Sequence, residues 1–464
     1  MGSITRELTR LQEQHGWLPE ASLRDLSERL GVPLHRLESL STFYTHFRRE
    51  PPAARTLEVC RDVACRMAGA SEAAAQWADR RELRNVEVRE VSCLGRCDRA
   101  PAGCVGARVV ALDDAADLTE ALTDPTLRRR AVRRWDADPY EPGAAYGGLR
   151  TAVVDLDATA LIDTIEAAGL RGMGGAGFPT ARKWRFVAGE PALPKYVICN
   201  ADESEPGTFK DREILHDLPH LVIEGMVLAG LCTGAESGIV FIRHEYAAER
   251  ERLEAELARA REQGALGESI FGSAHRFEIE VFVSPGGYIL GEETALLECL
   301  EDRRGEPRNK PPLPGRVGLH GRPTLINNVE TLAHAAAITT RGADWWKDLG
   351  RRERGGHKFL AVCGDVETPG VVLVPFGTTL GEVLEACGGM ADGRPLAALA
   401  PGGASSHFLG PEALEVLVDF EAVADAGSML GSGAVLFVAE GRDLLEIGVD
   451  VARFFRNESC GKCV

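Results

Sequence analysis

Four cysteines in two pairs constrain this chain more than any other feature of its sequence. Cys60 and Cys65 are separated by four residues, Cys93 and Cys97 by three, and each pair follows a segment typical of a strand, TLEVC or VEVREV. Four thiolates from two loops are a standard way to hold an iron–sulfur cluster. Two alternatives stay open: a zinc ion, whose sites more often use a tighter C-x2-C knuckle, and four unrelated core cysteines.

Size and charge narrow the class of protein. The 464 residues suggest two to four domains, and 44% hydrophobic with 27% charged residues fits globular domains. A net charge of −17 argues against a nucleic-acid partner, because phosphate backbones need a basic surface.

No apolar leader opens the sequence and no uncharged stretch would span a bilayer, so we expect a cytoplasmic protein with no membrane span. Six of the twelve cysteines lie in two compact clusters, which favours cluster ligation in a reducing compartment.

Apolar periodicity predicts a multidomain α/β protein. Helical spacing of leucines over residues 4–48 precedes a small α/β unit that includes a helix over residues 65–79. Further along, YVICN and SGIVFIR read as buried strands, and KFLAVCG and GVVLVPF as strands around a Pro-Gly turn. The expected domains are a helical and α/β cysteine-bearing unit (1–122), a linker (123–150), a large α/β domain (151–345), a small β-grasp domain (346–440) and the start of a C-terminal helical region (441–464).

A glycine-rich loop follows the first helix of the large domain. It reads Gly172-Met-Gly174-Gly175-Ala-Gly177-Phe178-Pro179. A helix rather than a strand precedes it, which is the wrong context for a dinucleotide fingerprint. The glycines still let the backbone approach a planar ring or a phosphate, and Pro179 suits the first turn of a helix whose N-terminus favours an anion. A glycine-rich packing turn is the structural alternative.

Acidic and amide side chains gather in the loops that follow. Asn200, Asp202, Glu203 and Glu205 come directly after a buried strand, where ligand sites of α/β proteins tend to lie. Three carboxylates within four residues repel one another, so a ligand with hydroxyl or amide donors explains them better than a structural role. Further segments of this kind are Gly291-Glu292-Glu293 and Asn327-Asn328, and Arg308-Asn-Lys310 adds cations that could bind pyrophosphate.

The N-terminal motifs resemble the small iron–sulfur subunit of respiratory complex I. The resemblance covers residues 5–122 and is carried by EVCRDVACRMAGA and VSCLGRCDRAPAG. It implies a thioredoxin-like domain behind a helical N-terminus, with Cys60, Cys65, Cys93 and Cys97 as ligands of a [2Fe–2S] cluster. Cys104, just past the motif, is expected to be a packing residue.

The remainder resembles the flavoprotein subunit of complex I and of soluble hydrogenases and formate dehydrogenases. GGAGFPTARKW, NADESEPGTFKD, GYILGEET and PTLINNVET carry this resemblance over residues 150–464. It implies bound FMN and NAD(H), with flavin contacts from Gly172, Gly174, Gly175, Gly177, Lys183, Asn200, Asp202, Glu203, Tyr288, Gly291, Glu292, Asn327 and Asn328, and nucleotide contacts from Phe178, Phe186, Glu205, Glu293 and Lys310. For hydride transfer the expected roles are Glu205 fixing the nicotinamide, Phe178 covering it and Lys183 neutralising charge.

The last motif, Glu458-Ser-Cys460-Gly-Lys-Cys463, resembles the first half of a C-x2-C-x2-C ligand set for a [4Fe–4S] cluster. The printed sequence ends before a third ligand. The remaining cysteines, 199, 232, 299, 363 and 387, lie in apolar contexts and are expected in the core. Two departures from the family are Met173, where many relatives carry Arg, and Leu313, where many carry Phe.

These motifs predict a diaphorase subunit that moves electrons between NADH and a partner of a soluble redox complex. The fusion of both modules in one chain disfavours ordinary complex I. Met173 and the stretch PGGASSHFLGPEALEVLVDFEAV resemble most the β subunit of formate dehydrogenases, whose partner would carry molybdenum or tungsten. The diaphorase subunit of a nickel–iron hydrogenase, the NADH dehydrogenase module of complex I, a non-catalytic scaffold and a zinc-bound assembly module at the N-terminus are the alternatives.

Overall fold

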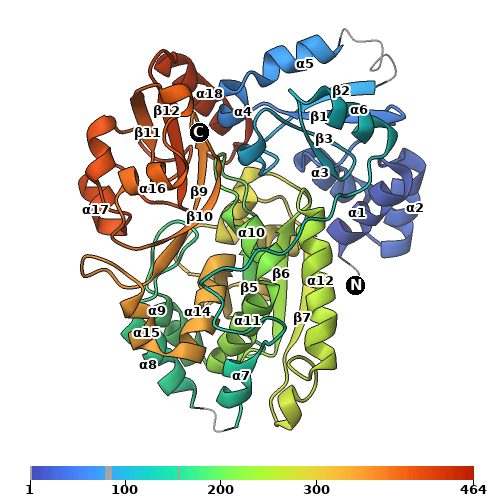
Figure 1. Ribbon diagram of the computed structural model, residues 1–464. Coiled ribbons are helices and arrows are strands. Elements are labelled where there is room, and N and C mark those ends of the chain that lie inside the picture. The colour runs from blue at the N-terminus through green and yellow to red at the C-terminus, as the bar shows by residue number, and fades with distance from the viewer. Residues whose placement is uncertain (1–2, 79–85, 155–156, 464) are drawn as a thin grey trace.

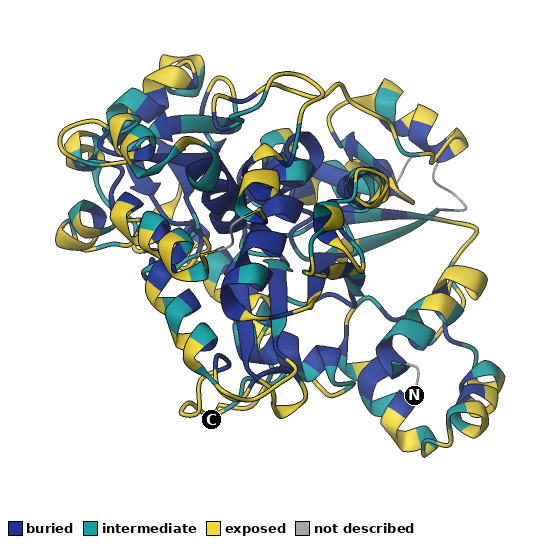
Figure 2. Cartoon of the chain, turned by 90° about the horizontal axis from the view of Figure 1, so that it is seen from below, coloured by how far each residue is buried: buried dark blue, intermediate teal, exposed yellow. Residues whose placement is uncertain are grey.

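Three four-stranded sheets organise the chain (Figure 1). The computed structural model describes residues 3–78, 86–154 and 157–463. The strands and the helices between the sheets are the most buried parts, shown dark blue in Figure 2, and the outer helices alternate between buried and exposed residues. This is the multidomain α/β architecture that the sequence predicts.

Three short helices open the chain, as the leucine spacing predicts: α1 (Ile4–His15), α2 (Glu20–Leu30) and α3 (Leu34–Phe43). Leu8 and Leu37 are fully buried in one apolar cluster with Phe241 and Phe282 of the central sheet. The apolar cluster of the cysteine-bearing sheet includes no described residue before Leu57. The N-terminal helices therefore bury their apolar side chains against the central unit.

The cysteine-bearing sheet has the order β2-β1-β3-β4. Its strands are β1 (Arg55–Cys60), β2 (Val86–Val91), β3 (Ala102–Val105) and β4 (Arg108–Ala111), with helices α4 (Val63–Met67), α5 (Ala70–Ala78) and α6 (Ala115–Thr123). The predicted helix over residues 65–79 is thus two helices, and residue 79 lies outside the described part of the chain. Because β1 and β2 are parallel, Cys60 and Cys93 leave the sheet at the same edge.

The segment expected as a linker packs on the central unit over part of its length. The indole of Trp135 is buried and donates to Asp217 Oδ2 at 2.9 Å. The hydroxyl of Tyr140 donates to Glu224 at 2.9 Å. The segment then ends in a short helix, α7 (Gly147–Ala152). The side chains of Trp135 and Tyr140 thus attach this segment to the central unit, which its polar composition did not predict.

The central sheet is parallel throughout and has the order β7-β6-β5-β8. Its strands are β5 (Tyr196–Ala201), β6 (Ser237–Arg243), β7 (Glu278–Ser284) and β8 (Thr324–Asn328), and its helices are α8 (Ala158–Ala168), α9 (Thr180–Gly189), α10 (Lys210–Asp217), α11 (Pro219–Thr233), α12 (Ala247–Glu262), α13 (Glu293–Leu300), α14 (Val329–Arg341) and α15 (Ala343–Asp348). Parallel strands buried on both faces read as continuous apolar runs. The loops after β5, β6 and β8 consequently meet at one edge of the sheet.

No single described helix is long and apolar enough to cross a bilayer. Only α10 and α11 taken together reach that length and composition, and a 92° bend separates them. Almost every residue of α11 is buried between the sheet and α14.

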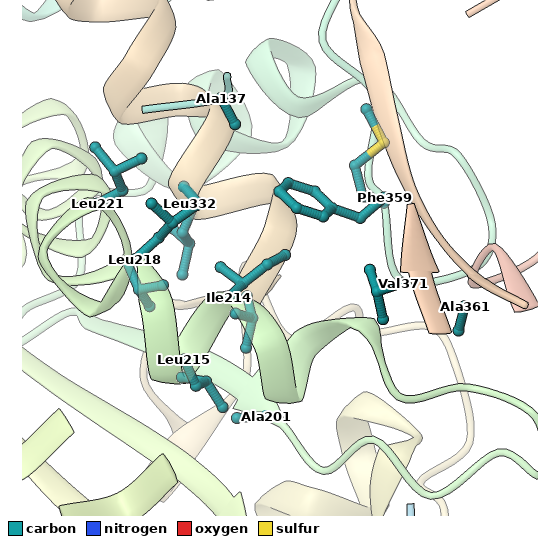
Figure 3. Packing of buried hydrophobic residues seen from close by; sticks show 14 of the residues in the cluster. Ala137, Ala201, Ile214, Leu215, Leu218, Leu221, Leu332, Phe359, Ala361 and Val371 are labelled. Carbon is teal, nitrogen blue, oxygen red and sulfur yellow. The ribbon is translucent and has the colours of Figure 1, made fainter. Parts of the chain in front are cut away.

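The third sheet has the order β10-β9-β12-β11. Its elements are β9 (His357–Gly364), β10 (Gly370–Pro375), α16 (Leu380–Ala386), β11 (Leu396–Ala400), α17 (Phe420–Asp425) and β12 (Ala434–Ala439). Phe359 of β9 and Val371 of β10 point toward Ile214 of α10 and Leu332 of α14 in Figure 3, so this sheet shares a core with the central unit. Helix α18 (Leu444–Asn457) then lies between the third sheet and α4 (Figure 1).

Candidate functional site

A cleft of about 580 Å³ opens at the carboxyl edge of the central sheet. Ten of the predicted flavin and nucleotide residues line it: Gly174, Gly175, Asn200, Asp202, Glu203, Glu205, Tyr288, Gly291, Glu292 and Asn328. The unit of the third sheet contributes Ser405, which belongs to the PGGASSHFLG stretch but was not predicted as a site residue, and Met429, Gly431 and Ser432, which no motif singled out. The cleft is large enough for a cofactor-sized ligand.

The glycine loop forms one wall of the cleft and needs its glycines. A Cβ on Gly174 would lie 2.7 Å from the Asn328 side chain, and one on Gly177, whose φ is +61°, would lie 2.8 Å from the Phe420 ring. Gly172 closes the loop by donating its N–H to Phe178 O at 2.9 Å. A side chain at either position would collide with the protein, so the glycines let the loop pack closely on Asn328 and Phe420.

Asp202 gives the cleft wall a buried carboxyl group with few protein donors, the hydroxyls of Ser204 and Ser284 being the ones beside it. Its side chain is buried, and its Oδ1 has no hydrogen-bond partner in the described chain, whereas Ser204 Oγ donates to its Oδ2 at 3.1 Å. Burial raises the pKa of this carboxyl to about 7. A buried acceptor without a partner costs free energy unless a ligand supplies the donor. The ribityl hydroxyls and ring N–H of FMN are donors of this kind, so the wall fits the predicted group.

Glu203 and Asn200 line the same wall, but their polar atoms are hydrogen-bonded to other protein groups. The Glu203 carboxylate accepts the backbone N–H groups of Asp211 and Arg212 at 2.9 and 3.1 Å. The Asn200 amide donates to Gly291 O at 2.8 Å. Both residues therefore fix the shape of the loops.

Glu205 holds a carboxylate at the mouth between the central unit and the third-sheet unit. Its Oε2 accepts the Tyr288 hydroxyl at 2.6 Å, and its Oε1 accepts the backbone N–H of Ser405 at 2.6 Å. Burial raises the pKa of Glu205. The two bonds fix its orientation from opposite sides of the cleft.

A cluster of ion pairs continues from the cleft toward α9. Lys310 Nζ lies 2.8 Å from Glu292 and 3.1 Å from Glu293, and Lys183 Nζ lies 3.1 Å from Glu293. Glu292, which also lines the cleft, joins this cluster to it. Predicted residues outside the cleft lining are Gly172, Gly177, Phe178, Lys183, Phe186, Glu293, Lys310 and Asn327.

Two aromatic rings on or next to α9 are half-exposed, one of them, Phe178, under the Arg182 guanidinium at 5.6 Å, and one amide is buried. The side chains of Phe178 and Phe186 are 51% and 44% exposed, so each offers a ring face to a planar ligand. Asn327 is buried and accepts the Trp184 indole N–H at 2.9 Å. Its amide oxygen is thus already used in the packing of α9 on β8.

The four predicted cysteine ligands are buried and contact one another. Cys93 and Cys97 lie 3.6 Å apart at Sγ, and Cys60 contacts both Cys65 and Cys93. The backbone N–H groups of Gly95 and Ala102 each donate to a cysteine Sγ at 3.4 Å. Hydrogen bonds from Cys60 and Cys97 hold the pKa of the Cys93 thiol well below its ordinary value.

The sulfurs of the four predicted ligands form one continuous set of contacts. Sulfurs in contact as Cys65–Cys60–Cys93–Cys97, with backbone donors around them, match the pairwise ligation of a [2Fe–2S] cluster. Cys363 of β9, expected as a core residue, lies beside Cys97 and with Cys93 raises the pKa of that thiol.

Glu458, two residues before Cys460, contacts the cleft residue Tyr288. Its Oε2 accepts the backbone N–H of Tyr288 at 3.0 Å. The Tyr288 ring packs edge-on against Phe454 of α18, with centroids 5.0 Å apart. Cys460 and Cys463 are partly or fully exposed, and two thiols do not complete the ligand set of a cubane cluster.

Comparisons with known proteins agree with this geometry. An NADH-quinone oxidoreductase subunit of Rhizobium meliloti is 43% identical over 325 residues, which span 70% of this chain and 77% of the relative. The chain belongs to the family of this NADH-quinone oxidoreductase subunit. The corresponding subunit of Escherichia coli, another member, is 40% identical over 328 residues, or 70% of this chain and 74% of the relative.

Family models match each of the three sheet-bearing units, the last over part of its length. The Nuo51 FMN-binding domain matches residues 165–337, the thioredoxin-like [2Fe-2S] ferredoxin matches residues 2–125, and the SLBB domain matches residues 359–409. A crystal structure of NAD+-reducing [NiFe]-hydrogenase in the air-oxidized state is 34% identical with a TM-score of 0.85, and the match covers 98% of this chain and 81% of that chain.

Family membership confirms the predicted class of enzyme and the predicted cofactors. The chain is an NADH oxidoreductase with an FMN-binding domain and a [2Fe–2S] domain in one polypeptide. The relatives named as subunits are parts of larger redox complexes.

Proposed function

We propose that this chain is the diaphorase subunit of a multisubunit redox enzyme, exchanging hydride with NAD(H) and single electrons with iron–sulfur clusters. One observation carries the proposal. Cys93 of the cysteine cluster lines a cavity of about 260 Å³ together with Ser204 and Tyr288, the residues that flank Glu205 in the cleft. The cysteine cluster is thus a neighbour of the cleft, as stepwise electron transfer between the two requires.

In this function the chain's own residues bind FMN and NADH and orient them toward each other. When bound, FMN supplies the conversion of a two-electron hydride, given up as NADH becomes NAD+, into two single electrons. Asp202 Oδ1 would accept a donor of the flavin, and Gly175, with no atom within 4 Å of an added Cβ, would let the ring approach the backbone. Glu205 would accept the carboxamide N–H of the nicotinamide, because its carboxylate is fixed by Tyr288 and Ser405.

The exposed rings and cations support the nucleotide side of the proposal. Phe178 would cover the nicotinamide and Phe186 would contact the remainder of the nucleotide, since both rings are half-exposed. Lys183 and Lys310 would neutralise phosphate charge in exchange for part of their pairing with Glu293. Leu313, 51% exposed, offers apolar contact but no aromatic stack.

Cys460 and Cys463 are proposed as two ligands of a [4Fe–4S] cluster on the strength of the motif alone. Two thiols leave that ligand set incomplete.

For the parent complex, formate dehydrogenase is our first proposal. It is supported by the fusion of the two modules, by Met173 and by the PGGASSHFLG stretch, whose Ser405 N–H holds Glu205. NAD+-reducing hydrogenase is the second candidate, because the solved hydrogenase matches 98% of this chain. A cytoplasmic location stays a prediction.

A visible spectrum and metal analysis test the function. The purified chain should show a flavin band that NADH bleaches, and it should contain iron rather than zinc. Absence of flavin from a folded, iron-loaded chain would favour the scaffold instead. The partner is decided by metal analysis of the intact complex: molybdenum or tungsten supports formate dehydrogenase, and nickel supports hydrogenase.

A further inference from the structure

Arg243 joins the cleft to the cysteine cluster. It is the last residue of β6, and only 3% of its surface is exposed. One guanidinium nitrogen, Nη2, donates to Cys93 O at 2.5 Å, and the other, Nη1, donates to Glu203 O. Cys93 follows a strand of the first sheet and Glu203 follows a strand of the central sheet, so a single side chain bridges the two redox loops.

Neighbouring side chains hold the same two loops together around Arg243. The Tyr246 hydroxyl donates to Glu203 Oε2 at 2.9 Å, and Gly95 packs so tightly on that ring that a Cβ would lie 2.6 Å from Oη. Arg212 donates its backbone N–H to Glu203 Oε2 at 3.1 Å and its Nη1 to Gly95 O at 2.7 Å. The position of the cysteine loop is therefore set by residues of the flavin loop and of β6.

The chemistry of arginine suits this place. A planar guanidinium serves several acceptors in fixed directions, whereas an ammonium is a point charge on a flexible stem. Glu245 takes a remaining donor of Arg243 at 2.8 Å and balances its charge. A reduced [2Fe–2S] cluster carries one more negative charge than the oxidised form, and a buried cation beside a ligand favours that form.

We propose that Arg243 is a positioning residue that fixes the cysteine loop against the flavin loop and raises the reduction potential of the [2Fe–2S] site. This inference rests on the proposed function, since it requires that cluster beside the cleft. The relevant step is the uptake of one electron by the oxidised cluster, with no proton and no bond broken.

A redox titration of the intact complex, followed by the electron paramagnetic resonance signal of the [2Fe–2S] cluster, tests this. Arg243→Gln should lower the midpoint potential by about 59 mV or more, a tenfold change for a one-electron couple. Glu245→Gln should move it the opposite way, because it removes the anion that balances Arg243. Arg108→Gln is the matched control: Arg108 is equally buried in the cysteine-bearing unit and paired with Asp117 at 2.7 Å, and it donates to neither loop.

Arg243→Lys separates position from charge. The midpoint potential of Arg243→Lys should lie close to that of the wild type, because the charge is kept. Hydrogen–deuterium exchange of residues 93–98 and 202–209 should nevertheless become faster, because the lysine cannot hold both loops. If Arg243→Gln does not fold, the opposed shift of Glu245→Gln and the exchange of Arg243→Lys still decide the matter. Potentials of Arg243→Gln and Glu245→Gln equal to that of Arg108→Gln would overturn the proposal. A wild-type complex without any [2Fe–2S] signal would instead overturn the function on which it rests.

Discussion

The hydroxyl of Tyr288 donates a 2.6 Å hydrogen bond to Glu205 Oε2, across the mouth of the cleft. Tyr288 comes from the loop after β7 and Glu205 from the loop after β5, so the bond ties two walls of the site together. It also fixes the orientation of the partly buried Glu205 carboxylate, which we assign to the nicotinamide.

Removal of this hydroxyl should weaken NADH binding. A hydrogen bond to a charged group contributes about 1.5–3 kcal/mol, so Tyr288→Phe should raise the KM for NADH about tenfold or more. Steady-state assays with an artificial electron acceptor measure this. Tyr196→Phe, at the start of β5 and outside the cleft lining, is the control and should leave KM unchanged.

A methyl group at Gly174 should prevent flavin binding. The added Cβ would meet the Asn328 side chain at 2.7 Å and push the loop out of place. We expect Gly174→Ala to retain less than about a tenth of the flavin, because displaced contacts of this kind cost at least about 1.4 kcal/mol. Gly189→Ala, with no atom within 4 Å of its added Cβ, should bind flavin normally. Equal flavin content in the two variants would contradict the assignment of the glycine loop to the flavin site.

Loss of one cysteine ligand should empty the iron–sulfur site. Cys60→Ala should lose about two iron atoms per chain and the corresponding paramagnetic signal. Cys104→Ala should lose neither, since Cys104 donates its thiol to Gly106 O at 3.0 Å, outside the sulfur cluster. Iron analysis and spectra of both variants check this. Retained iron in Cys60→Ala would revive the alternative of core cysteines.

Glu330 should be essential for stability. It is fully buried between Lys210, at 2.9 Å, and Lys358, at 2.5 Å, and so links α10 to β9. Breaking a buried pair leaves an uncompensated charge and costs about 3–5 kcal/mol. Glu330→Ala should therefore lower Tm by several degrees in thermal melts. Glu20→Ala breaks only the exposed pair with Arg24 and should leave Tm unchanged.

Glu224 should make the apoprotein less stable as pH rises. Burial raises its pKa from 4.5 to about 7 in the fold. Between those values the folded state holds a proton that the unfolded chain has lost, so stability falls as pH rises through this window and levels off above it. Glu224→Gln, which cannot ionise, should lose less Tm than the wild type between about pH 5 and 7. Parallel pH profiles of the two proteins would contradict the assignment.

The motifs alone predicted most residues of the cleft but not the wall that the unit of the third sheet contributes. Gly174, Asp202 and Glu205 are detectable because glycines and crowded carboxylates after a strand have few structural explanations. Ser405 and Met429 belong to a segment without such a pattern, and they reach the cleft only because the third sheet packs on α10 and α14. Glu203 and Asn327 carry the right chemistry, yet their polar atoms bond to protein partners elsewhere in the fold.

By itself the sequence determined the local chemistry: which loops follow strands, where glycine frees the backbone, and which thiols come in pairs. These properties depend on residues close together in the chain, so a pattern records them. Only the tertiary structure decided that the N-terminal helices cover the central sheet, that Cys363 lies beside Cys97 and that Arg243 bridges Cys93 and Glu203. Each of these contacts joins segments far apart in the chain, and packing of whole sheets, rather than any local preference, brings them together.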